Sequence, residues 1–250
     1  MSPKERIDLL VVELGLAETR TRAQALILAG NVLVNDVPIT KVGQKVERSA
    51  EIRTRGSEHP YVSRGGLKLK EALDVFHVSV NDRLALDVGA STGGFTDVLL
   101  QGGARKVHAL DVGHSQMDWK IRSNPRVVVY EGINARHLTF STIGEKVDVI
   151  TIDVSFISLS KILPPLRVFS HPTTDWITLI KPQFEVGPER VGKGGIVKDE
   201  GDQKMAVEEV TRSAESLGLK RLGLIESPIT GTSGNREYLA HWKMEFESLS

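Results

Sequence analysis

The stretch Asp87-Val-Gly-Ala-Ser-Thr-Gly-Gly-Phe-Thr96 places a carboxylate, glycines and hydroxyl groups within ten residues. It follows an apolar run and precedes another, which predicts a buried strand, a tight glycine turn and the first turn of a helix. Such a junction binds polar ligands, because helix N-terminal amides and glycines without Cβ let a ligand approach the backbone. The next predicted strand ends at Asp111. An acid about 20 residues after the turn is suited to hold two ribose hydroxyls.

Three other interpretations of this turn compete. The spacing Gly89-x-x-x-Gly93-Gly94 lacks the second glycine of G-x-G-x-x-G, which favours a smaller nucleoside ligand over NAD. Gly89-Ala-Ser91-Thr-Gly93 also matches the G-x-S-x-G nucleophile elbow of hydrolases, but the sequence singles out no acid and histidine for a triad. A turn with only a backbone role is the default for the turn alone, and the paired Asp111 argues against it.

Charged residues also end two later apolar runs. One predicted strand ends at Asp153 and the next ends at Lys181, while Lys68 precedes the first strand and Glu237 begins the last. A strand that ends in a charge is often only a strand that reaches solvent. The repetition at Asp111, Asp153 and Lys181 favours a site, because the carboxyl ends of parallel strands share one edge of the sheet.

Composition sets limits on the function. The chain has 250 residues, enough for one large domain or one ordinary and one small domain. Lys and Arg total 32 and equal Asp and Glu, so any affinity for nucleic acid needs a local patch. The absence of Cys excludes disulfides, thiolate metal sites and a thiol nucleophile, and the seven His are scattered, so no metal is expected. The charged start and the lack of a long apolar run predict a soluble, cytoplasmic protein.

Strands and helices alternate after Arg83, which predicts an α/β fold with a mostly parallel, doubly wound sheet. The seventh strand follows its neighbour without a helix between them, which predicts an antiparallel insertion at one edge. Strands are expected near residues 83–88, 106–111, 126–130, 147–153, 175–181, 221–226 and 237–244. Helices are expected near residues 66–76, 94–101, 115–122, 158–169 and 200–217.

The N-terminal part is a separate small α+β unit, with two short helices in residues 4–30 and strands near 32–35 and 51–54. It is too small to be an enzyme. Turn formers without periodicity follow it, which predicts a domain boundary. The predicted organisation is a first domain of residues 1–58, a linker of residues 59–62 and a second domain of residues 63–250.

Several segments of the small unit resemble the S4 RNA-binding fold of ribosomal proteins and RNA-modifying enzymes. These are Arg6-Ile-Asp8, Gly15-Leu-Ala-Glu-Thr-Arg20, Ala23-Gln-Ala-Leu-Ile27 and Gly30-Asn-Val-Leu-Val-Asn35. Arginines that lead a helix can grip phosphates while its other face packs on the strands. The alternative is an ordinary solvated helix face. The residues expected to bind RNA are Arg6, Arg20, Arg22, Lys41, Arg64 and Lys193.

The segment from Ser63 to Trp242 resembles the FtsJ-like ribose 2′-O-methyltransferases, and with the S4-like unit the chain resembles the TlyA (haemolysin A) family of rRNA methyltransferases. The motifs are Ser63-Arg-Gly-Gly-Leu-Lys68-Leu, the glycine stretch, Asp153-Val-Ser-Phe-Ile-Ser-Leu159, Lys181-Pro-Gln-Phe-Glu-Val-Gly187 and Ser227-Pro-Ile-Thr-Gly-Thr-Ser-Gly-Asn-Arg-Glu237-Tyr. The resemblance implies a Rossmann-like fold with a seven-stranded, mostly parallel sheet. It also implies S-adenosylmethionine-dependent 2′-O-methylation of ribosomal RNA, with cytidine as the expected nucleotide.

The resemblance implies a Lys-Asp-Lys-Glu tetrad at Lys68, Asp153, Lys181 and Glu237. Lys181 would take the proton of the 2′-hydroxyl in its neutral form, which a nearby Lys68 cation and burial would favour. Asp153 would orient the lysine and the cofactor, while Lys68 and Glu237 would hold the ribose. The residues expected to bind S-adenosylmethionine are Asp87, Gly89, Ser91, Gly93, Gly94, Phe95, Asp111, Asn134 and Asp153.

Two departures and one further motif qualify this interpretation. Ser91-Thr92 stands where the wider FtsJ group often has a proline, and both Glu131 and Asn134 are candidates for contact with the adenine. The run from Gly187 to Gly194 has the first seven positions of a P-loop but no Ser or Thr at the eighth, so a mobile flap over RNA fits better. The alternative functions are a membrane-lytic haemolysin and an RNA-binding protein with an inert methyltransferase fold.

Overall fold

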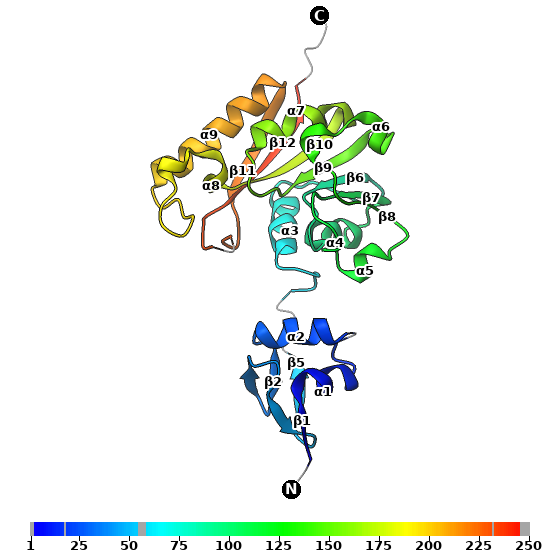
Figure 1. Cartoon of the computed structure of the whole chain (residues 1–250). Coiled ribbons are helices and arrows are strands. Elements are labelled where there is room, and N and C mark those ends of the chain that lie inside the picture. The colour runs from blue at the N-terminus through cyan, green and yellow to red at the C-terminus, as the bar shows by residue number, and fades with distance from the viewer. Residues whose placement is uncertain (1–2, 18, 55–58, 232, 246–250) are drawn as a thin grey trace, which may run out of the picture. The chain divides into compact units, whose positions relative to one another are not determined.

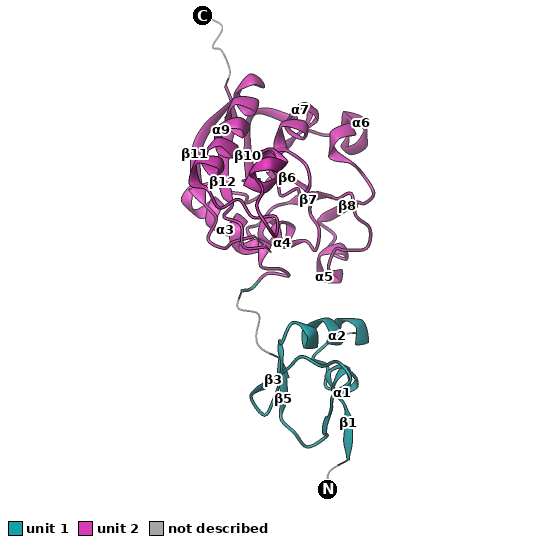
Figure 2. Ribbon diagram, turned by 60° about the vertical axis from the view of Figure 1, so that its left-hand side comes forward, with its two compact units in different colours: residues 1–60 teal, residues 61–250 magenta. Residues whose placement is uncertain are grey.

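The computed structural model describes residues 3–17, 19–54, 59–231 and 233–245. The chain forms two compact units, residues 1–60 and residues 61–250, coloured teal and magenta in Figure 2. Residues 55–58, in the predicted boundary region, lie outside the described residues. Each unit has a hydrophobic core of its own.

The small unit contains the two predicted helices, α1 (Ile7–Glu13) and α2 (Arg20–Leu28). The predicted strands are confirmed as β2 (Val32–Val34) and β5 (Ile52–Thr54). Three further strands of three residues each were not predicted. They are β1 (Lys4–Arg6), β3 (Val37–Ile39) and β4 (Lys45–Glu47).

Local chemistry explains the sheets of the small unit. Asn35 and Asp36 both have positive φ, 48° and 66°, which suits the two-residue turn that joins β2 to β3. The strands form an antiparallel sheet of order β3-β2-β5, and β1 pairs separately with β4. Ile7 and Val11 from α1 pack with Ile27 from α2 in the core beneath.

The large unit is built on a seven-stranded sheet of order β11-β12-β10-β9-β6-β7-β8. Neighbours from β10 to β8 pair in parallel, while β12 is antiparallel to both β10 and β11. The predicted antiparallel insertion is therefore confirmed, one strand in from the edge. The strands are β6 (Leu84–Val88), β7 (Lys106–Leu110), β8 (Val127–Tyr130), β9 (Val147–Ile152), β10 (Ser170–Ile180), β11 (Leu219–Glu226) and β12 (Tyr238–Met244).

Helices cover both faces of this sheet (Figure 1). One face packs against α3 (Gly65–Val75), α4 (Gly94–Gln101) and α5 (Trp119–Arg122), through side chains such as Leu69, Leu99 and Ile121. The other face packs against α7 (Leu163–Leu166) and α9 (Glu200–Ser216). Trp176 and Trp242 are fully buried there, and burial of such large apolar groups stabilises this layered arrangement.

Two predicted helices are shorter than expected. In residues 115–122 only α5 is helical, because Ser115 has a left-handed φ of 55° and Asp118 caps the helix by accepting a hydrogen bond from the Lys120 amide at 3.0 Å. The segment 158–169 is divided into η2 (Leu159–Lys161), α7 and η3 (Arg167–Phe169). The proline pair at 164 and 165 lacks the N–H groups that a continuous helix needs.

The remaining short helices lie in loops at the carboxyl edge of the sheet or between strands. They are η1 (Ala135–His137), α6 (Phe140–Ile143), α8 (Pro182–Glu185) and η4 (Pro188–Arg190). They were not predicted, since single turns have too few residues to show a helical period. The helix α8 begins at Pro182, separated from the end of β10 only by Lys181, so it fixes the chain that follows Lys181.

Candidate functional site

The glycine turn between β6 and α4 is held close to two other parts of the large unit. Gly89 has a φ of +85°, and a Cβ at this position would lie 2.3 Å from the carbonyl oxygen of Asp153. A Cβ on Gly94 would lie 2.2 Å from Ser63 Oγ, ahead of α3. Glycine is therefore required at position 89, and a side chain at position 94 would force the Ser63 hydroxyl to move away from the turn.

Asp87 supports this turn from below. It is fully buried, and its two oxygens accept hydrogen bonds from Thr96 Oγ1 at 2.6 Å and Thr151 Oγ1 at 2.9 Å. Burial raises the pKa of Asp87 to about 6. The carboxyl group thus connects β6 with α4 and β9.

Asp111 holds the turn from the side. Its Oδ2 accepts a hydrogen bond from the Ser91 amide at 2.8 Å, and its Oδ1 accepts one from the Gly113 amide at 2.7 Å. A carboxylate oxygen has room for a second donor. Asp111 can therefore keep the turn in place and still accept hydrogen bonds from a ligand.

A cavity of about 540 Å³ opens beside the turn. Five of the predicted cofactor-binding residues line it, namely Gly89, Ser91, Asp111, Asn134 and Asp153. The other four, Asp87, Gly93, Gly94 and Phe95, are not among its lining residues. Phe95 is buried in the core, and a Cβ on Gly93 would meet Ile121 at 3.2 Å, so both lie behind the wall.

All four predicted tetrad residues line a second cavity, of about 650 Å³. Lys68 comes from α3, Asp153 directly follows β9, Lys181 directly follows β10 and Glu237 directly precedes β12. Their side chains are between 3% and 22% exposed. The structure therefore brings together four ionisable groups that are widely separated in the sequence.

The four groups form two ion pairs. Lys68 Nζ donates to Glu237 Oε2, and Lys181 Nζ lies 2.6 Å from Asp153 Oδ1 and donates to Ser155 Oγ at 2.8 Å. Each ammonium thus faces a carboxylate. Repulsion between Lys68 and Lys181, which the sequence led us to expect, is offset by these partners.

Asp153 Oδ1 has an incomplete environment. The atom is buried and accepts no aligned hydrogen bond, although the Lys181 ammonium lies within ion-pair distance. The charge of Lys181 balances this oxygen, which keeps room for a further donor. A polar or cationic ligand in the neighbouring cavity would complete this environment.

The two cavities share part of their walls. Gly89, Ser91, Asp153, Ser155 and Phe156 line both. A ligand in one cavity can therefore meet a ligand in the other next to Asp153. Such an arrangement permits direct transfer of a small group between two bound molecules.

Phe156 is an exposed aromatic residue on this shared wall. Its φ of 64° is strained for a bulky residue, its side chain is 91% exposed, and its ring centroid lies 5.1 Å from that of Phe184. Sequence reasoning missed both Phe156 and Ser155. Their position directly after the strand that ends at Asp153 was the signal that could have identified them.

Glu185 fixes the loop that carries Phe156. Its Oε2 accepts a hydrogen bond from Ser158 Oγ at 2.6 Å, and its Oε1 accepts one from the Leu159 amide at 3.0 Å. Burial raises the pKa of Glu185. The loop after β9 is therefore tied to α8, which follows Lys181.

The geometry does not support the hydrolase alternative. Ser91 has a left-handed φ of 48°, as a nucleophile elbow would, but within the described residues its hydroxyl bonds to Gln116 Oε1 at 3.3 Å and to no histidine. A serine nucleophile needs a base within hydrogen-bond reach.

In the small unit, two of the predicted RNA-binding residues are held by Asp8. This carboxylate is fully buried and accepts hydrogen bonds from Arg6 Nε at 2.9 Å, Arg20 Nε at 2.8 Å and Gln24 Nε2 at 3.2 Å. The hydrogen bonds from Arg6 hold the pKa of Asp8 well below its usual range. The two arginine side chains remain 38% and 52% exposed.

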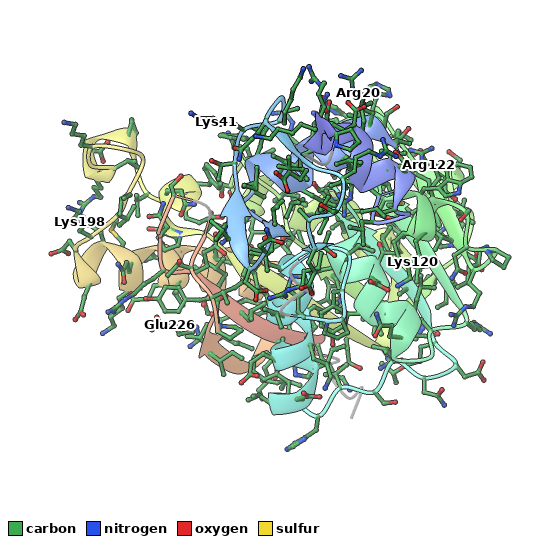
Figure 3. All side chains as sticks on the ribbon, turned by 90° about the horizontal axis from the view of Figure 1, so that it is seen from below. Arg20, Lys41, Lys120, Arg122, Lys198 and Glu226 are labelled. Carbon is green, nitrogen blue, oxygen red and sulfur yellow. The ribbon has the colours of Figure 1, made fainter. Side chains whose placement is uncertain are left out.

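The other predicted RNA-binding residues are placed as follows. Arg22 and Lys41 are exposed on the small unit, and Figure 3 shows Arg20 and Lys41 there. In the large unit, Arg64 lines the second cavity, and Lys193 is exposed in the loop between η4 and α9. Lys193 is not itself a lining residue, but Gly194 and Gly195 next to it are.

Comparison with known proteins identifies both units. Residues 61–244 match the model of the FtsJ-like methyltransferases, and residues 5–52 match the S4 domain. A Bacillus subtilis protein named "Putative rRNA methyltransferase YqxC" is 47% identical, over 96% of this chain and 86% of its own length. The 16S/23S rRNA (cytidine-2′-O)-methyltransferase TlyA of Mycobacterium tuberculosis is 45% identical, over 95% of this chain and 89% of its own length.

Solved structures agree. The structure described as "Putative hemolysin from Streptococcus thermophilus" has a TM-score of 0.76 and 43% identity, and the match covers 98% of this chain and 90% of that one. No helix in the described part of this chain is long and apolar enough to span a membrane. The chain belongs to the FtsJ-like methyltransferase family, with an S4 domain at its N-terminus.

Proposed function

We propose that this protein transfers a methyl group from S-adenosylmethionine to the ribose 2′-hydroxyl of a cytidine in ribosomal RNA. The observation that carries the proposal is the convergence of Lys68, Asp153, Lys181 and Glu237 on one cavity, which shares a wall with the cavity beside the glycine turn. The name of the Mycobacterium tuberculosis relative, a 16S/23S rRNA (cytidine-2′-O)-methyltransferase, supports the choice of rRNA and cytidine. Ribosomal RNA as substrate also implies that the protein acts in the cytoplasm.

The first cavity fits S-adenosylmethionine. Asp111 can accept hydrogen bonds from the ribose hydroxyls, Asn134, which lines the same cavity, would contact the adenine, and Asp153 would face the cationic end. The cofactor supplies a methyl group that is already activated by its positive sulfur. Asp87, Gly93, Gly94 and Phe95 support the turn from behind and would act without touching the cofactor.

The second cavity fits the target nucleotide. Lys181 would contact the 2′-hydroxyl and accept its proton when the amine is neutral, while Asp153 and Ser155 hold the amine in position. The Lys68–Glu237 pair offers donors and acceptors to the rest of the ribose. Phe156, exposed at the shared wall, would stack against the base.

The small unit would recruit the RNA. In the organisation proposed here, residues 1–58 bind RNA, residues 59–62 connect and residues 63–250 catalyse. Arg6 and Arg20, preorganised by Asp8, present guanidinium groups that suit phosphate oxygens, with Arg22 and Lys41 beside them. Arg64 would contact the nucleotide in the second cavity.

Mass mapping of ribosomal RNA tests the proposal. Purified protein is incubated with unmethylated ribosomal subunits and labelled S-adenosylmethionine, and the RNA is digested and mapped. One methyl group on the 2′-oxygen of a cytidine is the expected result. Methylation of a base would refute the 2′-O assignment, and S-adenosylmethionine binding without transfer to either subunit would support the inert-fold alternative.

A further inference from the structure

The turn Gly192–Gly195 forms part of the wall of the second cavity, through Gly194 and Gly195. It is closed by a hydrogen bond from the Gly195 amide to the Gly192 carbonyl at 3.1 Å, and the Gly192 amide donates to Ile196 at 3.0 Å. The sequence predicted a mobile flap here. The structure shows that one side of this turn is anchored.

Asn235 provides the first anchor. It is only 2% exposed, and its Oδ1 accepts a hydrogen bond from the Val197 amide at 2.9 Å while its Nδ2 donates to the Gly195 carbonyl at 2.8 Å. A side-chain amide offers both a donor and an acceptor, and here both are used on one backbone segment. Asn235 thus holds the segment as a neighbouring strand would.

Gln203 on α9 provides the second anchor. Its Nε2 donates to the Val197 carbonyl at 2.9 Å, and its Oε1 accepts from Tyr238 Oη at 2.9 Å. Fully satisfied buried networks rigidify the segments that they join. Because Asn235 lies two residues before Glu237, this network fixes the turn relative to the tetrad.

The free side of the turn has the chemistry of an anion site. Within the described residues, the Lys193 ammonium has no acidic partner, and neither the Lys193 amide nor the Gly194 amide donates a hydrogen bond to the protein. Gly194 and Gly195 have positive φ, +78° and +77°, and a Cβ on Gly195 would meet nothing within 4 Å. Unused turn amides beside a cation suit a phosphate.

We propose that Asn235 is a positioning residue that clasps the Gly192–Gly195 turn to the wall of the second cavity, where the turn binds an RNA phosphate next to the target ribose. This inference rests on the proposed function. It goes further, because it assigns a phosphate contact to backbone amides and Lys193, and it makes that contact depend on the side chain of Asn235, which also lines the cavity.

A double-mutant cycle tests the clasp. The variants Asn235→Ala, Lys193→Ala and their combination are compared by the KM for RNA, kcat and the affinity for S-adenosylmethionine. Each single change is expected to raise the KM by about tenfold, with little change in kcat or cofactor affinity. The double variant is expected to be no worse than either single one, because Lys193 loses its place when the clasp is gone.

Two further variants make the result decisive. Lys220→Ala removes an exposed charge at the far end of β11 and is expected to leave all three quantities unchanged. Gly195→Ala strains the turn without removing Asn235 and should raise the KM as Asn235→Ala does. If Asn235→Ala lowers the melting temperature or weakens cofactor binding, the KM of Gly195→Ala for RNA decides whether the clasp exists.

The outcomes separate the two proposals. Wild-type protein that methylates no ribosomal RNA refutes the proposed function. If wild-type protein is active, either of two results overturns the clasp and leaves the proposed function standing. One is that the effects of Asn235→Ala and Lys193→Ala add in the double variant. The other is that Gly195→Ala leaves the KM for RNA unchanged.

Discussion

Two carboxylates, one in each unit, have different environments. Asp8 in the small unit accepts hydrogen bonds from three side chains and is fully satisfied. Asp153 in the large unit has one buried oxygen without an aligned donor and lines both cavities. A ligand can complete the environment of such an oxygen. The comparison teaches that the network of Asp8 is closed within its own unit, while Asp153 keeps an open position at the wall that the two cavities share.

Removal of the Lys181 amine, which lies beside Asp153, should have the largest effect on the rate of methyl transfer. We expect Lys181→Ala to lower the rate of methyl transfer by roughly 100- to 10,000-fold, the usual range for loss of a general base. Cofactor binding should remain nearly unchanged, because the amine lies in the second cavity. Single-turnover transfer and calorimetric titration with S-adenosylmethionine measure the two quantities.

The exposed Lys204 on α9 offers a matched control, since its side chain is 80% exposed. Lys204→Ala should leave the rate unchanged. If Lys181→Ala instead abolished cofactor binding, Lys181 would be a ligand of the cofactor and its assignment as base would be wrong.

Asp87 extends the comparison, because it is saturated but lies beneath the site. Its pKa is about 6 in the folded protein, above the ordinary value of 3.8. The protonated form is therefore favoured by folding, and this contribution is present below about pH 4 and lost as the pH rises through about 6. The loss is up to about 3 kcal/mol.

Denaturant unfolding of wild type and Asp87→Asn at pH 4 and pH 7.5 measures this loss. The wild-type free energy of unfolding should fall relative to that of the variant over this interval. Burial acts to raise the pKa of Asp175, but hydrogen bonds from His241 and Arg83 and the nearby positive charges together outweigh it and lower the pKa to about 2, so this group titrates outside the interval. A constant difference between the two proteins would show that Asp87 is ionised throughout.

The saturated network of the small unit should contribute to stability and to the positions of Arg6 and Arg20, but not to cofactor binding. We expect Asp8→Asn to destabilise this unit by about 2 kcal/mol, because Arg6 loses a bidentate acceptor and Arg20 loses its partner. The affinity for S-adenosylmethionine should not change. Hydrogen exchange at α1 and α2 measures the first effect, and a weakened cofactor affinity would contradict the division of roles.

The smallest effect is expected at the shared wall. Phe156→Ala should raise the KM for RNA by an amount equivalent to about 1 kcal/mol, because a stacking surface for the base is lost. Phe156→Tyr keeps the ring and should behave as wild type. Equal KM values for the alanine variant and wild type would exclude stacking at this position.

The alternation of strands and helices was sufficient to predict the sheet and to place Asp153 and Lys181 at its edge, while the tetrad as a set was implied by the family resemblance. Apolar strands that end in Asp153 and Lys181 must place these residues on one edge once the sheet is parallel. The pairing within the tetrad could not be predicted. That Lys68 faces Glu237, and not Lys181, depends on the direction of α3 relative to the antiparallel β12, which no local pattern encodes.

Other parts of the site could not be predicted from the sequence, because they depend on irregular backbone. Phe156 owes its exposure to a left-handed φ, and Asn235 owes its role to two hydrogen bonds with a loop 38 to 40 residues away. Such contacts follow no period along the chain. The segmented helix after Asp153 was foreseeable in part, because Pro164 and Pro165 interrupt it.

The common boundary of the two cavities has a kinetic consequence. Donor and acceptor can occupy the protein at the same time, and no residue has to carry the methyl group between them. Turnover then requires a ternary complex, so double-reciprocal plots against either reactant should intersect and never run parallel.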